Sequence, residues 1–83
     1  MLKATAEISL YPLNQDYIPA IDDFIARLKA HPGFTVKVNA TSTQVSGEYD
    51  ALFKAIQQEI KGTFLQEGKY VFAVKFLKGD LLT

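Results

Sequence analysis

The spacing of apolar residues along this chain switches between two periods, and this switching restricts the fold more than any other feature. Residues 4–11 alternate between apolar and polar side chains, which is typical of a strand with one buried face. Pro12 ends this run because proline cannot donate to a sheet ladder. Between Asp16 and Pro32, apolar residues recur three and four positions apart, which predicts a helix with one buried stripe. We expect that stripe to consist of Ile18, Ile21, Phe24, Ile25 and Leu28.

The second half of the chain repeats the same change of period. Residues 34–39 and 43–48 alternate again, and the connection between them is so short that the two strands should form an antiparallel hairpin. Helical spacing follows from Tyr49 to Lys61, and Gly62 is predicted to begin a loop. Residues 69–77 form the last alternating run. The predicted order is therefore strand, helix, strand, strand, helix, strand.

Right-handed connections turn this order into an α+β sandwich of the βαββαβ kind, with a four-stranded antiparallel sheet and both helices on one face. The 83 residues leave room for one hydrophobic core, so residues 1–83 are predicted to be a single domain. A domain of this size buries only about 60–65% of its unfolded surface, which makes self-association a reasonable expectation.

The uncovered face of the sheet is predicted to carry hydrogen-bonding groups beside an apolar last strand. This combination suits either a small-molecule site or an interface between subunits. The predicted residues are Glu7, Ser9, Tyr11, Lys37, Asn39, Gln44, Ser46, Glu48, Val71, Ala73, Lys75 and Leu77.

Composition argues against several classes of function. Nine basic and nine acidic side chains give a formal net charge of zero, whereas a nucleic-acid binder normally shows a basic excess. There is no cysteine, and the single histidine has no companions at metal-ligand spacing, so no metal site is predicted. No stretch approaches the ~20 apolar residues that span a bilayer. We therefore expect a cytoplasmic protein with no cofactor, no nucleic-acid partner and no membrane contact.

No residue is predicted to be catalytic. His31 is expected to assist the exposed carbonyls at the end of the first helix, and no Gly-x-Ser-x-Gly elbow is present. Arg27, the only arginine, is expected on the wet side of that helix, away from the loop where phosphate-ester chemistry would need it. A pair of carboxylates on the open face, Glu7 and Glu48, leaves acid–base chemistry as an alternative.

Two segments indicate a family as well as a fold. The first is Ile8-Ser9-Leu10-Tyr11-Pro12-Leu13. The second runs from Asn39 to Asp50 and reads Asn-Ala-Thr-Ser-Thr-Gln-Val-Ser-Gly-Glu-Tyr-Asp. Together with Val74-Lys75-Phe76, they resemble the YkoF-like thiamine/hydroxymethylpyrimidine-binding family, long catalogued as a domain of unknown function. The resemblance covers most of the chain. It implies a ferredoxin-like fold, assembly into homodimers or tetramers, and binding of thiamine or its hydroxymethylpyrimidine moiety without turnover, in thiamine supply or salvage.

An aminopyrimidine presents an amine donor and ring-nitrogen acceptors, so it suits a carboxylate or amide together with hydroxyl groups in a partly apolar slot. This chemistry and the resemblance give the candidate ligand-binding residues Ser9, Tyr11, Asn39, Thr43, Gln44 and Glu48. Tyr11 would supply a stacking surface. Thr43 is included on the resemblance, because strand parity turns its side chain toward the core.

Two other functions stay open at this point. One is an enzyme of the dimeric α+β barrel type, with Glu7 or Glu48 as a general base in a dry cavity. The other is a regulatory or structural module that only oligomerises through its open face. A structure in which both carboxylates are solvated or paired would argue against the enzyme.

Overall fold

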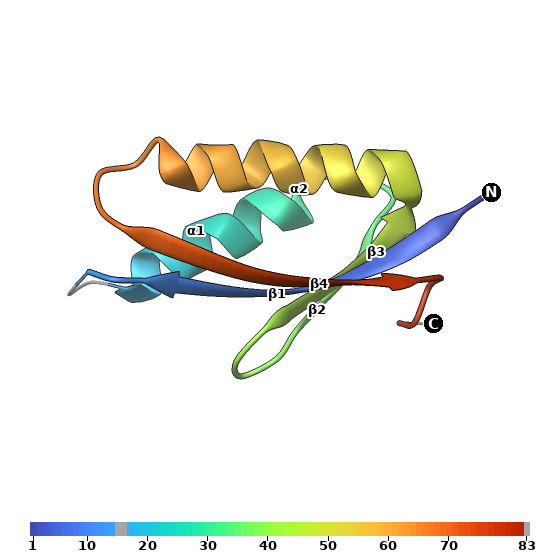
Figure 1. The fold of residues 1–83 in the computed structure, drawn as a ribbon, viewed down its shortest axis with the longest axis horizontal. Helices are drawn as coiled ribbons and strands as arrows, with labels where there is room; N and C mark the ends of the chain where they lie inside the picture. Colours follow the sequence, from blue (N-terminus) through green and yellow to red (C-terminus); the bar gives the residue numbers. More distant parts are fainter. Residues whose placement is uncertain (15–16, 83) are drawn as a thin grey trace.

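The computed structural model describes residues 1–14 and 17–82, and its elements follow the predicted order (Figure 1). The elements are β1 (Lys3–Pro12), α1 (Tyr17–Lys29), β2 (Thr35–Val38), β3 (Thr43–Glu48), α2 (Tyr49–Phe64) and β4 (Tyr70–Lys78). The four strands form one antiparallel sheet in the order β2-β3-β1-β4, and both helices cover the same face. The fold is therefore the expected α+β ferredoxin-like βαββαβ sandwich. Asp16, the predicted start of the first helix, lies outside the described residues.

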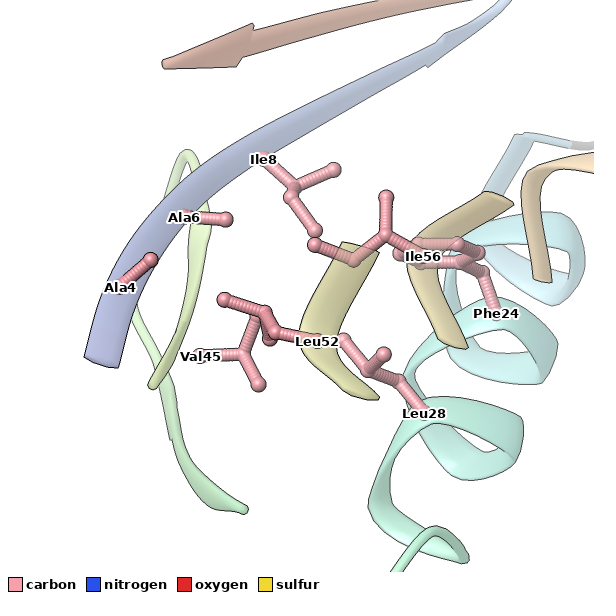
Figure 2. Close-up of a cluster of buried hydrophobic side chains, with 8 residues drawn as sticks. All are labelled: Ala4, Ala6, Ile8, Phe24, Leu28, Val45, Leu52 and Ile56. Atoms are coloured by element: carbon pink, nitrogen blue, oxygen red, sulfur yellow. The ribbon is translucent and has the colours of Figure 1, made fainter. Parts of the chain in front are cut away.

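The core lies between the central strands and the two helices. Its members converge from β1, β3, α1 and α2, as Figure 2 shows, and they are Ala4, Ala6, Ile8, Phe24, Leu28, Val45, Leu52 and Ile56. The small side chains of Ala4 and Ala6 alternate with Thr5 along β1, so the predicted inward face of this strand is confirmed. Phe24 extends the core to β4 by packing on Phe72, with 5.0 Å between ring centroids.

The buried stripe of α1 is rotated from the predicted one. Phe24 and Leu28 are buried as expected, but the third buried member is Ala20, and Ile18 is 57% exposed. Positions 20, 24 and 28 lie four residues apart and share one face, and the small alanine gives little hydrophobic signal in the sequence. Ile21 and Ile25 are therefore only partly buried, beside this stripe.

The prediction that α2 ends at Lys61 was wrong, because the helix continues to Phe64 with Gly62 inside it. A Cβ atom at Gly62 would collide with Nη1 of Arg27. This glycine therefore gives room for a neighbouring side chain and does not end the helix. Two main-chain bonds close the helix: the N–H of Leu65 donates to the Lys61 carbonyl, and the N–H of Gln66 donates to the Thr63 carbonyl, each at 3.0 Å.

The placement of Arg27 on the wet side of α1 was also wrong. Its guanidinium crosses to α2, where Nη1 donates to the Glu59 carboxylate at 2.7 Å and Nη2 donates to the Thr63 hydroxyl at 2.7 Å. Nε2 of His31, just beyond the end of α1, lies 2.6 Å from the other oxygen of Glu59. Both basic groups thus act across the helix pair, since Glu59 is only 7% exposed and needs partners there.

Part of the open sheet face is covered by the C-terminal segment of the same chain. By strand alternation Thr5 lies on the open face with Glu7, yet it is only 2% exposed. Its hydroxyl donates to the Gly79 carbonyl at 2.8 Å and accepts from the Leu81 N–H at 3.0 Å. The chain after β4 therefore folds back over the first residues of β1.

Among the described residues, none of the helices is both long and apolar enough to cross a membrane.

Candidate functional site

A cleft of about 450 Å³ opens between α1, the end of β1 and the connection from β2 to β3. One wall is apolar and comes from β1 and α1: Ile8, Leu10, Ile21, Phe24 and Ile25. The opposite side comes from the β2–β3 connection and the first residue of β3, and it is mainly polar: Asn39, Ala40, Thr41, Ser42 and Thr43. Tyr11, Pro12 and Leu13, where β1 ends, complete the lining. The cleft lies on the helix-covered side of the sheet, whereas the sequence had pointed to the open face.

The polar side of the cleft is held in place by hydrogen bonds to β1. The main-chain N–H of Asn39 donates to the Ser42 carbonyl at 2.8 Å, which closes the turn. The Ser9 hydroxyl donates to the Thr41 carbonyl at 3.1 Å. A longer bond of 3.4 Å runs from the Ser42 hydroxyl to the Glu7 carboxylate. The turn is thus fixed from the open face while its other side lines the cleft.

Three of the six predicted site residues are brought together at this cleft: Tyr11, Asn39 and Thr43. Thr43 is 5% exposed and faces the helices, as strand parity requires. Tyr11 is 54% exposed, so much of its ring remains open to solvent. The amide nitrogen of Asn39 donates to the Gln44 side chain at 3.3 Å, which orients the amide group.

The other three predicted residues lie outside the cleft lining and have partners of their own. Ser9 and Gln44 support the turn, through the bonds to Thr41 and Asn39. Glu48 caps α2, because its carboxylate accepts from the main-chain N–H groups of Asp50 and Ala51. Glu48 lies five positions along β3 from Thr43, which separates them by about 17 Å at the usual rise of a strand.

Sequence reasoning did not single out Thr41, Ser42 or the α1 wall. Thr41 and Ser42 belong to a short polar turn, and such turns are usually polar without any ligand. The sequence of α1 did indicate a cleft wall. Ile21 and Ile25 are apolar but lie beside the buried stripe of Phe24 and Leu28, so the core alone does not account for them. Apolar surface beyond the needs of the core is what a cleft wall exposes.

Both carboxylates that were candidates for a general base have partners. Glu7 accepts from Gln44 at 3.4 Å and lies 3.5 Å from the Lys75 ammonium on the open face. Its side chain is 31% exposed and Glu48 is engaged as a helix cap. Among the described residues, no group of three or more histidine, aspartate or glutamate side chains is placed to hold a metal ion.

The open face has a hollow of its own, of about 430 Å³, with a more charged lining. Its lining consists of Thr5, Glu7, Lys37, Gln44, Lys75, Leu77, Leu81 and Leu82. This hollow is bounded in part by the chain's own C-terminal residues. It is therefore distinct from the neutral cleft on the helix side.

The structure is thus a small α+β domain with a neutral cleft between a helix and a hairpin. Residues 3–77 match the YKOF-related family, and the chain belongs to that family. The match covers every strand and helix, apart from the last residue of β4. Among curated proteins, none matches the chain significantly.

Solved structures share the fold over nearly the whole chain. A Streptococcus pneumoniae protein is 26% identical, with a TM-score of 0.85 over 98% of this chain and 91% of that one. An uncharacterised Methanocaldococcus jannascii protein is 22% identical, with a TM-score of 0.81 over 100% and 87% of the two chains. A Thermotoga maritima protein, provisionally assigned to thiamine biosynthesis or salvage, is 21% identical, with a TM-score of 0.79 over 89% and 81%.

Proposed function

We propose that this protein binds thiamine or its hydroxymethylpyrimidine moiety in the cleft, without converting it, and serves thiamine supply or salvage. The observation that carries the proposal is the cleft itself, in which hydroxyl and amide groups face an apolar wall. Membership of the YKOF-related family supports it, as does the similarity to a protein provisionally assigned to thiamine biosynthesis or salvage. A single domain spanning residues 1–83 is part of the proposal.

The lining suits a flat, neutral heteroaromatic ring. Ile21 and Ile25, both partly buried, offer apolar surface to the face of the ring, and the half-exposed Tyr11 offers a further stacking surface. The hydroxyl of Thr43 and the amide of Asn39 both donate and accept, which matches the amine and ring nitrogens of an aminopyrimidine. A volume of about 450 Å³ lies within the usual range for small-molecule sites.

The side chains that acid–base chemistry would need have partners outside the cleft, which supports binding without turnover. Glu7 is paired with Lys75, and Glu48 caps a helix at the far end of β3. His31 contacts Glu59 between the helices. None of these three is among the described residues that line the cleft. These contacts favour a binding protein over an enzyme with a carboxylate base.

Assembly into homodimers or tetramers stays a prediction. The apolar outer residues of the edge strand β4 are consistent with it, since Val71 is 47% exposed and Leu77 is 40% exposed. A protein that only oligomerises would show this surface too, but it would have no affinity for a pyrimidine.

Calorimetric titration with thiamine and with hydroxymethylpyrimidine tests the proposal. The parent protein should bind at least one of the two saturably, and Thr43→Val should weaken binding by about tenfold through loss of one hydrogen bond. Thr35→Val is the matched control, because Thr35 is an exposed strand threonine outside the cleft. Absence of heat with either compound at millimolar concentration would contradict the proposal.

A further inference from the structure

Resting on the proposed function, we infer that the cleft selects the uncharged form of the pyrimidine. The free hydroxymethyl alcohol binds, and its phosphate ester is rejected. The inference concerns the same cleft and follows from where the chain places its charged side chains.

The cleft brings together apolar and neutral polar groups. Every described side chain that lines it is uncharged. Ile8 and Phe24 on the apolar wall are each 2% exposed, and Thr43 on the polar side is 5% exposed. These surroundings compensate for the lost hydration of a neutral ring, but they do not compensate for the lost hydration of an anion.

Three basic side chains on the surrounding elements are engaged or directed elsewhere. Arg27, on the same helix as the cleft wall, is held by Glu59 between the helices. Lys75 on β4 pairs with Glu7 on the open face of the sheet. Lys37 on β2 lines the open-face hollow. A phosphate group in the cleft would therefore find no lysine or arginine among the described lining residues.

The sequence extends this argument through the segment that joins β1 to α1. No lysine or arginine occurs anywhere between Lys3 and Arg27, a stretch that includes the rest of β1 and most of α1. The cleft is lined by the second and third turns of α1, at Ile21 and Ile25, and not by its N-terminal amides. Pro19 in the first turn has no N–H to donate to an anion.

Selection of the neutral form places the protein before phosphoryl transfer in a reaction sequence. It holds the alcohol that such a transfer consumes and releases the ligand once the hydroxymethyl oxygen is phosphorylated. Since two negative charges have no counterion in the cleft, the alcohol should bind at least about tenfold more tightly than the ester.

Calorimetric titrations of the parent protein with hydroxymethylpyrimidine and with its phosphate monoester measure this ratio. Ile21→Lys adds a cation to the cleft wall and should reduce the ratio by tightening the ester. Ile18→Lys adds the same charge to the same helix at a position that is 57% exposed and outside the cleft lining, so it should leave the ratio unchanged. Melting curves establish that each variant is folded, and the ratio for the parent decides alone if Ile21→Lys does not fold.

The outcomes separate this inference from the proposed function. If the alcohol binds and the ester binds equally or more tightly, the selection is refuted while the proposed function stands. Equal changes of the ratio in Ile18→Lys and Ile21→Lys would also refute it, because the effect would then come from overall charge and not from the cleft. If neither compound binds, the proposed function fails, and this inference fails with it.

Discussion

The guanidinium of Arg27 in α1 donates to both the carboxylate and the main-chain carbonyl of Glu59 in α2, at 2.7 and 2.9 Å. Arg27 also pairs with Asp23 one turn earlier in its own helix, at 3.1 Å. This contact fastens α1, which forms one wall of the cleft, to the longer helix of the sandwich. The geometry of the cleft therefore depends in part on a polar contact outside it.

Arg27→Ala should lower the free energy of unfolding by about 3 kcal/mol, because it leaves the buried carboxylate of Glu59 without one of its two cationic partners. Urea denaturation measures the change. Lys54→Ala is the control, since Lys54 is an exposed residue of the same partner helix, and its effect should stay within about 0.5 kcal/mol. A similar small loss for both variants would show that Arg27 does not join the helices energetically.

Gly62→Ala should destabilise the protein even though alanine is the better helix former. The added methyl group would displace the guanidinium of Arg27 from its position beside α2. In the Arg27→Ala background that conflict is absent, and the same substitution should stabilise the helix by about 1 kcal/mol. Urea denaturation of the two single variants and the double variant tests for this change of sign. The same sign in both backgrounds would contradict the role assigned to Gly62.

The pH dependence of stability should report on Glu59. Burial on its own raises the pKa of this carboxyl, but the hydrogen bonds from His31 and Arg27 outweigh it and hold the pKa below its ordinary value of 4.5. A carboxyl that is more acidic in the folded state contributes stability that is fully present above pH 4.5 and is lost as the pH falls through its folded pKa.

Glu59→Gln should therefore be less stable than the parent at neutral pH, and the difference should shrink as the solution is acidified. Free energies of unfolding from about pH 7 to about pH 3 provide the measurement. Glu67→Gln, at an exposed carboxyl, is the control. A difference between parent and Glu59→Gln that stays constant over this range would count against the predicted shift.

Glu48→Ala separates a structural role from a ligand role at one of the predicted site residues. Loss of the cap should cost about 1 kcal/mol of stability. Pyrimidine affinity should not change, since Glu48 lies about 17 Å along β3 from the cleft. Thermal unfolding and calorimetric titration of the same variant test the two statements together. A clear loss of affinity in a folded variant would show that Glu48 does belong to the binding site.

The fold could be predicted because the apolar residues of each element recur at the spacing of a strand or of a helix. The alternation in β1 and the single turn between β2 and β3 specified the strands, and the apolar spacing specified both helices. Gly62 was misread because a glycine that ends a helix and a glycine that admits a neighbouring side chain look alike in sequence. The cross-helix position of Arg27 depends on Glu59, which is 32 residues away, so local pattern could not reveal it.

The site could be predicted only in part for a related reason. Thr43 was included on the family resemblance and Asn39 as a polar residue of the predicted open face, and the structure brings both to the cleft beside Tyr11. Ser9 and Gln44 are close in sequence to cleft residues, but their side chains point to the turn and the open face. Strand parity distinguishes the two faces of a sheet, but it does not show which face carries the deeper cavity.

Mapping of the bound pyrimidine by two-dimensional amide NMR tests the central claim most directly, and a chain of 9.2 kDa suits the method. Saturation with hydroxymethylpyrimidine should shift the amide signals of residues 39–43 and of α1 around Ile21 and Ile25. Signals of Glu48 and Leu81 should stay in place. Shifts centred on Lys75 and Leu81 would move the ligand to the open face, and the absence of any shift at saturating concentration would contradict the account.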